Sequence, residues 1–378
     1  MKKSFLALAL MGAFSGAAFA QSSVTVYGIA DAGFQSLDNG TPAGRFNKLQ
    51  SGQENGSRLG FKGTEDLGGG LKANFVLEMG LNIDDGSSAQ GRTFGRRSTV
   101  GLSGDFGSVD LGRDKTPTFK FFDNFDPFAS GFINSGNGLS NLYFIGGTAT
   151  VAGANANSGG RASNAIYYYT PANLGGFSAV GQYGFGEAAG DNSAGRSLGV
   201  NLRYNADGLD VGYSFVKDNG QAAANGPVNA RKGNTLAVAY DFGVAKPVFI
   251  YQKVSDDAAL AVDQKIFSLG VTVPFDPSNK ILATFTKIKD STLIAANSSA
   301  TVGDAKQFAI GYQYTFSKRT DLYTAFASTT QDANSQKVGA AVNSDKTFLK
   351  GKKDEVKGRV QQKVADTKEK VYKGVEKM

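Results

Sequence analysis

The clearest pattern in the chain is an alternation of apolar and polar residues between positions 57 and 83. From Leu71 to Ile83 every odd-numbered position is apolar, whereas most even-numbered positions are polar. Because successive side chains of a strand point to opposite faces, this run predicts a strand with one apolar face. A shorter run from Arg58 to Thr64 has the same pattern, and Leu67-Gly68-Gly69-Gly70 connects the two. We expect a hairpin with one apolar and one charged face.

A half-buried sheet of a soluble protein would also alternate, but two observations argue against it. The apolar face of the 71–83 run has seven residues, whereas a globular strand usually has about five or six residues in all. The pattern also recurs along the chain with no predicted helix or second sheet to cover the apolar faces. A closed barrel in lipid, apolar outside and polar inside, satisfies both observations. The sequence therefore predicts an all-β protein, a transmembrane antiparallel β-barrel.

Fifteen strands can be assigned from the alternation. They are expected near 23–35, in the two runs within 57–83, and near 92–103, 108–113, 161–170, 177–185, 198–204, 209–215, 235–242, 246–254, 265–273, 280–288, 308–316 and 321–329. For 92–103 the pattern does not decide which face is apolar. Bacterial barrels are even-stranded, so we expect sixteen strands, with the last one after residue 345.

One connection, residues 114–160, is much longer than the others. Long connections in compact proteins are usually functional. Its first half carries Asp114, Lys115, Lys120, Asp123 and Asp126 among many phenylalanines, and its second half is rich in Gly, Asn and Ala. Because so aromatic a segment is poorly suited to full solvation, we expect its first half to fold into the barrel.

The N-terminal segment, residues 1–20, has the three parts of a signal peptide. Lys2 and Lys3 form a basic start, residues 5–14 form an apolar centre, and Ala18-Phe19-Ala20 is a small-x-small cleavage site. No other window approaches the roughly 20 consecutive apolar residues of a membrane-spanning helix. Export combined with amphipathic strands predicts the outer membrane of a Gram-negative cell, with membrane lipid and lipopolysaccharide as surroundings.

Composition and charge exclude several classes of function. The chain has no Cys and no His, so it lacks thiolate chemistry, the usual general base and the commonest metal ligand; we expect no enzyme, cofactor or metal site. The net charge of +7 is misleading, because residues 346–378 hold eleven basic and five acidic residues and the first twenty hold two lysines, which leaves −1 for the rest. No basic groove with interleaved aromatics is present, which argues against nucleic-acid binding.

Four segments resemble the general porins of Gram-negative bacteria, in particular the β-proteobacterial type. They are SRLGFKGTEDLGGGLKANFVLE at 57–78, GRRSTVGLSGDFGSVDLGRDKTPTF at 95–119, RASNAIYYYTPANLGGFSA at 161–179 and YQYTFSKRTDLY at 312–323. The resemblance implies a sixteen-stranded porin barrel over residues 21–349, a homotrimer, and passive diffusion of small hydrophilic solutes and ions. It also implies a long third loop that bends inward and narrows the channel.

In such porins a cluster of wall arginines faces loop carboxylates across the constriction. Matching these segments to the family places the arginines at Arg58, Arg96 and Arg161. Alternation independently puts Arg58 inside, but it does not choose between Arg96 and its neighbour. Asp123 and Asp126 are the candidates for the loop side. Three arginines against two aspartates predict a weak preference for anions.

The end of the chain departs from the family, whose members finish with a short strand ending in Phe. Residues 346–349 begin such a strand, but residues 350–378 have valines at helical spacing among Lys and Glu and end in Met378. This pattern is typical of an amphipathic helix or a disordered basic tail. Two alternatives to a conducting porin therefore stay open: a non-conducting barrel that acts as a surface anchor or adhesin, and a frameshifted product that cannot close.

Overall fold

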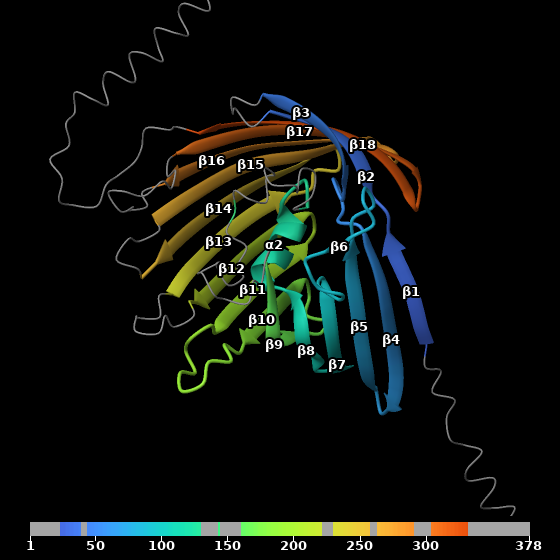
Figure 1. Cartoon of the computed structure of the whole chain (residues 1–378), viewed down its shortest axis with the longest axis vertical. Helices are drawn as coiled ribbons and strands as arrows, with labels where there is room; N and C mark the ends of the chain where they lie inside the picture. The colour runs from blue at the N-terminus through green and yellow to red at the C-terminus, as the bar shows by residue number, and fades with distance from the viewer. Residues whose placement is uncertain are drawn as a thin grey trace, which may run out of the picture.

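The computed structural model describes residues 23–38, 44–129, 143, 160–220, 230–257, 263–290 and 304–331 of the 378-residue chain. These residues form a sixteen-stranded antiparallel sheet, a separate two-stranded sheet and the helix α2, Pro117–Phe125. Figure 1 shows that the large sheet curves around α2. Within the described ranges, no helix is long and apolar enough to cross a membrane. The predicted signal peptide (1–20) and basic tail (350–378) lie outside the described residues.

The large sheet follows the order of the chain, and each strand pairs with the next one except β6, which pairs only with β5 while β5 also pairs with β7. Its strands are β1 (Ser23–Ile29), β4 (Arg58–Gly68), β5 (Leu71–Leu81), β6 (Ser88–Ala89), β7 (Arg97–Gly104), β8 (Gly107–Lys115), β9 (Arg161–Tyr169), β10 (Phe177–Gly184), β11 (Ser197–Ala206), β12 (Leu209–Asn219), β13 (Ala230–Tyr240), β14 (Lys246–Asp256), β15 (Asp263–Asp276), β16 (Asn279–Asp290), β17 (Ala305–Ser317) and β18 (Thr320–Gln331).

Each of the fifteen strands predicted from alternation is present in this sheet. The additional strand is the two-residue β6, which pairs only with β5. Within the described residues β1 and β18 are the two terminal strands of the sheet. The strand predicted after residue 345 lies outside the described residues.

The first predicted strand, 23–35, is wrong in its second half. β1 ends at Ile29, and β2 (Ala32–Asp38) leaves the large sheet to pair with β3 (Arg45–Ser51). The buried carboxylate of Asp31 explains the break, because it accepts the backbone N–H groups of residues 53, 54 and 55. These bonds draw the chain away from the ladder, and the segment predicted as a plain loop contains a hairpin.

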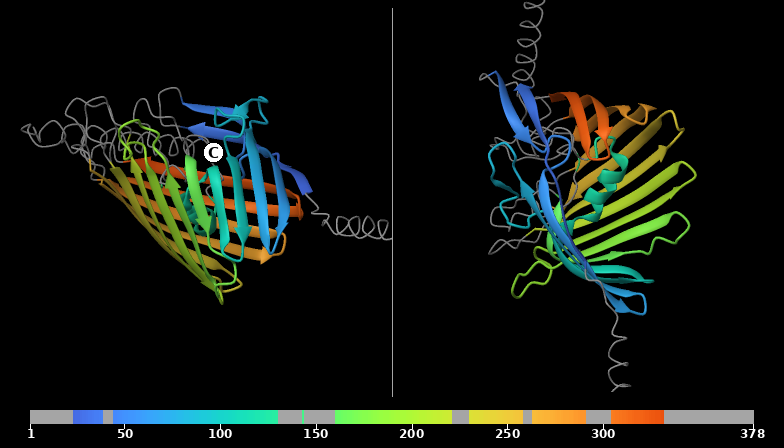
Figure 2. Two further views of the ribbon diagram at one scale, coloured as in Figure 1. Left: turned by 90° about the horizontal axis from the view of Figure 1, so that it is seen from below. Right: turned by 90° about the vertical axis from the view of Figure 1, so that its right-hand side faces the viewer.

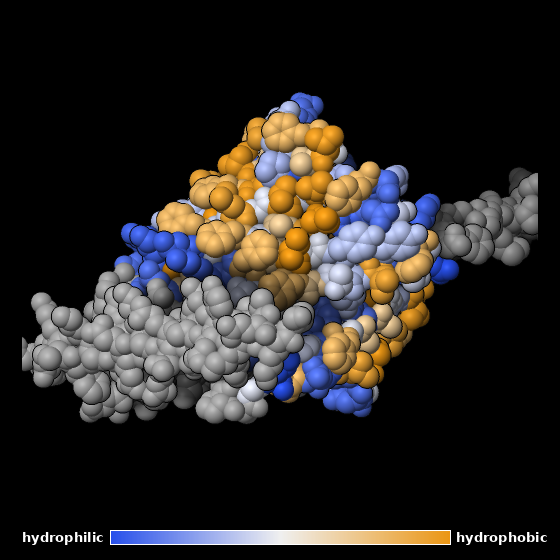
Figure 3. All heavy atoms as spheres, turned by 90° about the horizontal axis from the view of Figure 1, so that it is seen from above, coloured by the Kyte–Doolittle hydropathy of each residue, from blue (hydrophilic) through white to orange (hydrophobic). Residues whose placement is uncertain are grey.

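The outward face of the sheet is apolar, as predicted. On β7 the side chain of Val100 is 59% exposed whereas that of Thr99 is 6% exposed, so the apolar face of this strand points outward. The strand begins at Arg97, five residues after the expected start. In Figure 3 hydrophobic side chains gather in a broad band on the visible face of the molecule. Such a band suits contact with hydrocarbon rather than water.

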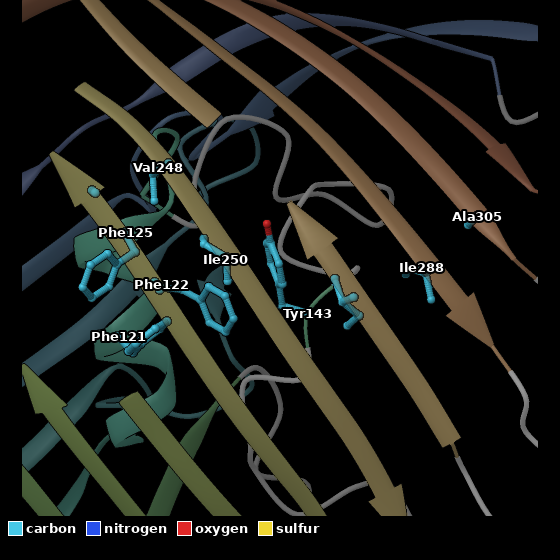
Figure 4. Close-up of a cluster of buried hydrophobic side chains, with 11 residues drawn as sticks. Phe121, Phe122, Phe125, Tyr143, Val248, Ile250, Ile288 and Ala305 are labelled. Carbon is cyan, nitrogen blue, oxygen red and sulfur yellow. The ribbon is translucent and has the colours of Figure 1, made fainter. Parts of the chain in front are cut away.

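The inward face is more apolar than the predicted polar lumen. Ala237, Ala239, Ile250 and Ile266 point inward from β13, β14 and β15 and are nearly fully buried. They belong to one cluster with phenylalanines of α2, drawn in Figure 4. The reason is that α2 lies against β10 to β13, and Tyr143, whose ring stacks on that of Phe122, belongs to the same cluster, so the apolar residues of this part of the wall face packed side chains.

Candidate functional site

The helix α2 begins at the end of β8 because the sequence supplies a strong start signal. Thr116 is its N-cap, and the Oγ1 atom of Thr116 accepts the N–H of Phe119. Pro117 occupies the first turn, where a missing N–H costs nothing. Threonine followed by proline is a helix-start signal in the sequence, but the sequence analysis predicted only an aromatic segment inside the barrel and no helix. The inward folding is confirmed, and the helix is new.

One side of α2 is pressed against the inner wall. Phe121, Phe122 and Phe125 are at most 3% exposed, and the rings of Phe121 and Phe125 lie 4.7 Å apart. A Cβ atom at Gly212 of β12 would lie 2.5 Å from a ring carbon of Phe125. Only glycine therefore allows the helix to approach this closely. The helix is thus seated off-centre, as Figure 2 also shows.

Two ion pairs tie α2 to the strand that precedes it. Lys120 Nζ lies 2.7 Å from Asp114 Oδ2, and Lys115 Nζ lies 2.6 Å from Asp123 Oδ2. Lys120 also donates to the hydroxyl of Tyr169 on β9. Burial lowers the pKa of Lys120, and the charge of Asp114 opposes this shift. Burial likewise raises the pKa of the Asp123 carboxyl, against the attraction of Lys115.

The predicted wall arginines lie next to one another. Arg161 Nε donates to the carbonyl oxygen of Arg96 over 2.9 Å. Arg96 Nε lies 2.7 Å from Glu78 Oε1 on β5. Both arginines are at most 7% exposed, although Arg96 precedes the first residue of β7. The motif-based choice of Arg96 thus identifies a residue inside the barrel that strand parity could not assign.

Arg58 joins this group through Gly56. Arg58 Nε donates to the carbonyl oxygen of Gly56, and a Cβ atom at Gly56 would lie 2.6 Å from Arg96 Nη1. The absence of a side chain at Gly56 therefore lets both guanidinium groups contact the same backbone segment. The structure brings all three predicted arginines together.

The two predicted loop carboxylates have different positions. Asp123 interacts electrostatically with Arg58 and Arg161, so it belongs to the same cluster. Asp126 is the C-cap of α2 and is 5% exposed, and its Oδ1 accepts the N–H of Phe128. The hydrogen bond described for Asp126 is thus to the loop backbone, and its place at the constriction stays a prediction.

Several charged residues of the cluster were not predicted as site residues. Arg97 Nη2 lies 2.7 Å from Asp110 Oδ2 on β8, and Arg97 Nε lies 3.5 Å from Asp114. Arg113 donates to the carbonyl oxygen of Gly95 and to Ser163. Asp110 alternates with the outward Leu111 on β8, so parity could have found it. Arg113 has the same parity as Leu111 and faces inward only because the register shifts between Gly112 and Asp114.

The constriction cluster is defined by these contacts. It comprises seven cations, Arg58, Arg96, Arg97, Arg113, Lys115, Lys120 and Arg161, and four carboxylates, Glu78, Asp110, Asp114 and Asp123. These charges lie on the inner wall and on α2, inside the curve of the sheet. A lipid-facing antiparallel sheet with a charged constriction inside is the architecture of an outer-membrane channel.

Comparison with known proteins agrees with this architecture. The family model described as Gram-negative porin matches residues 7–334. Outer membrane porin protein 32 of Delftia acidovorans is 37% identical over 329 residues, covering 85% of this chain and 88% of the relative. An outer membrane porin protein of Bordetella pertussis is 33% identical and covers 90% of this chain and 99% of the relative.

A solved structure is similar along most of its length. The anion-selective porin from Comamonas acidovorans superimposes with a TM-score of 0.69 at 34% identity, covering 82% of this chain and 89% of that chain. The chain belongs to the family of Gram-negative porins, proteins of the outer membrane. The resemblance inferred from the four sequence segments is confirmed.

Proposed function

We propose that this porin forms a water-filled channel that passes small hydrophilic solutes passively and prefers small anions weakly, with no catalysis. One observation carries the preference: the constriction cluster holds seven cations and four carboxylates. Field lines are focused in a narrow, low-dielectric throat, so an excess of a few charges sets ion preference. The similar solved porin described as anion-selective supports the same sign.

The pairing inside the cluster shows which cations lack a carboxylate partner. Asp114 and Asp123 each lie within ion-pair distance of a lysine, and Glu78 lies beside Arg96. Within the described residues, Arg58 and Arg161 have no carboxylate within 4.0 Å. Arg58 is the less buried of the two, so its guanidinium group is the more accessible to a passing anion.

The decisive measurement is the reversal potential of the reconstituted channel in a salt gradient. We expect an anion-selective potential for the unmodified chain and a smaller one for Arg58→Gln and for Arg161→Gln. The matched control is Arg45→Gln, which removes the same charge from the β2–β3 hairpin. A cation-selective potential of the unmodified protein, or equal shifts from all three variants, contradicts the proposal.

We also propose that the chain assembles as a homotrimer surrounded by outer-membrane lipid, as the family resemblance implies. The outward apolar face supports a lipid or subunit contact rather than a solvated surface. Stepwise closing of channels in groups of three would support the trimer. Independent single steps, together with a monomer mass by light scattering in detergent, would exclude it.

A further inference from the structure

A single aromatic ring lies against two cations of the constriction cluster. Phe119, in the first turn of α2, has Lys115 Nζ 4.3 Å and Arg161 Cζ 5.3 Å from the centroid of its ring. Both distances fall within the roughly 6 Å of a cation–π contact. Phe119 is 8% exposed and Arg161 is 6% exposed, so the contact between them is largely shielded from water.

The two cations are placed where they repel each other. Lys115, the last residue of β8, is directly opposite Arg161, the first residue of β9, in the strand ladder. Like charges in this position destabilise a sheet. The helix α2 begins immediately after Lys115, its N-terminus adds a partial positive charge, and its first turn contains no acidic residue. Three sources of positive potential thus meet around the ring of Phe119.

Carboxylates relieve only part of this repulsion. Lys115 forms an ion pair with Asp123 at 2.6 Å. In the part of the chain that the structure describes, no carboxylate lies within 4.0 Å of Arg161. The Nε atom of Arg161 donates to the backbone carbonyl oxygen of Arg96, which is uncharged. The negative face of the Phe119 ring therefore supplies attraction that no ion pair supplies to this guanidinium group.

We infer that Phe119 is a positioning residue for ion preference, whose ring holds Arg161 and Lys115 at the constriction without neutralising them. An aromatic ring attracts a cation through its quadrupole, although its net charge is zero. A carboxylate at the same place would also hold the guanidinium group, but it would cancel the charge that attracts anions. The inference rests on the proposed anion preference and names a residue that sustains it.

The first test weakens the quadrupole of the ring while nearly keeping its size. Pentafluorophenylalanine is introduced at position 119 of the full chain by nonsense suppression, and the reversal potential of the reconstituted channel is measured in a salt gradient. The fraction of Arg161 held over the ring should fall about two- to fivefold, the range set by the strength of a cation–π contact. We therefore expect the anion-to-cation permeability ratio to fall toward that of Arg161→Gln, with a monofluorinated ring in between.

The matched control is pentafluorophenylalanine at position 122. The ring of Phe122 belongs to the same helix and stacks on that of Tyr143, and among the described residues no cation lies over it. Fluorination at position 122 should therefore leave the permeability ratio unchanged. The control separates the electrostatic effect of the ring at position 119 from a general effect of fluorine on the packing of α2.

A second measurement, thermal unfolding in detergent, does not depend on selectivity. If the ring holds the guanidinium group, Phe119→Leu should lower the unfolding temperature less in an Arg161→Gln background than in the unmodified chain. Additive effects of these two substitutions, or equal shifts of the permeability ratio from fluorination at positions 119 and 122, overturn the inference. A cation-selective unmodified channel would contradict the proposed function, while the unfolding measurement would still decide whether Phe119 holds Arg161.

Discussion

At the scale of single residues, the constriction depends on a few buried contacts between opposite charges. Glu78 accepts hydrogen bonds from Arg96 on one oxygen and from Tyr27 on the other. It is therefore the carboxylate that both positions Arg96 and offsets part of the positive charge of the wall. Substitutions can separate the positioning of Arg96 from the effect on net charge, because Glu78 and Arg96 carry opposite charges.

Replacing either partner breaks the same contact but changes the field in opposite directions. Glu78→Gln should increase anion preference, since a negative charge leaves the throat, whereas Arg96→Gln should decrease it. Each should also lower stability by about 3 kcal/mol, because a buried charge loses its partner. Reversal potentials and thermal unfolding of both variants check this. A shift of the same sign in both would show that geometry, not charge, controls selectivity.

A second residue, Glu54, gives the molecule a pH dependence. Burial, together with the charges of Asp321 and Asp31, raises the pKa of Glu54 from 4.5 to about 7, while Lys280 opposes the shift. The folded state therefore holds this proton more tightly than the unfolded state does. Stability from this group is present at low pH and is lost as the pH rises from about 4.5 to 7.

Glu54→Gln should make the unfolding temperature less dependent on pH across this window. The uncharged amide cannot lose a proton, so the decline between acid and neutral pH should shrink. Thermal unfolding in detergent at several pH values measures it, with Glu65→Gln, an exposed position on β4, as the comparison. An unchanged pH profile in Glu54→Gln would show that other groups produce the dependence.

At the scale of elements, α2 is held by shape as well as by charge. Glycines on four strands of the inner wall accommodate the loop: Gly199 faces Pro117, Gly212 faces Phe121 and Phe125, Gly270 faces Pro127, and Gly311 faces Phe128. The loop thus packs along a row of glycine positions on β11, β12, β15 and β17. We therefore expect the width of the channel to depend on how closely these surfaces meet.

Gly212→Leu should push α2 away from the wall and into the lumen. Single-channel conductance is then expected to fall, and stability should decrease because the phenylalanines lose their packing. Gly181→Leu is the matched control, since a side chain there meets nothing within 4 Å. Equal conductance of the two variants would mean that α2 does not limit the current.

At the scale of the whole molecule, alternation predicted the large sheet well because lipid imposes one rule on every strand. Outward positions such as Leu202 and Phe249 must be apolar wherever the strand lies. The same rule failed at Asp31, where a side chain takes over backbone donors and turns the chain into the β2–β3 hairpin. Local hydrogen bonding of this kind leaves no periodic trace in a sequence.

The candidate site could be predicted only in part for a related reason. Arg58, Arg96 and Arg161 were found because they lie in long matched segments. Their neighbours in the cluster, Glu78 beside Arg96 and Lys115 beside Asp123, come from other strands, and these contacts depend on strand register and on the path of α2. The apolar part of the inner wall was not predicted, because it depends on which strands the inward-folded loop packs against.

One contact connects distant parts of the chain. The hydroxyl of Tyr323 on β18 donates to Asp31, the residue that follows β1 closely and anchors the turn toward β3. Since β1 and β18 are the terminal strands of the described sheet, this bond holds its two ends near each other. It acts across 292 residues of sequence.

Tyr323→Phe should lower the stability of the folded protein by about 1.5–3 kcal/mol, the usual range for a hydrogen bond to a charged group. Tyr213→Phe removes a comparable hydroxyl contact, to Asn234 on a neighbouring strand, and should cost less. Unfolding temperatures in detergent compare the two. An equal or smaller loss in Tyr323→Phe would show that the two ends of the sheet do not depend on this contact.

The line of wall glycines also has an evolutionary consequence. A larger residue at position 212 collides with Phe125, and a smaller residue at position 125 leaves a hole above Gly212. Neither change is tolerated well alone, but the two together can restore the fit. In related porins we therefore expect positions 125 and 212 to change together. The residues that shape the aperture would then vary jointly, while the external loops vary independently of them.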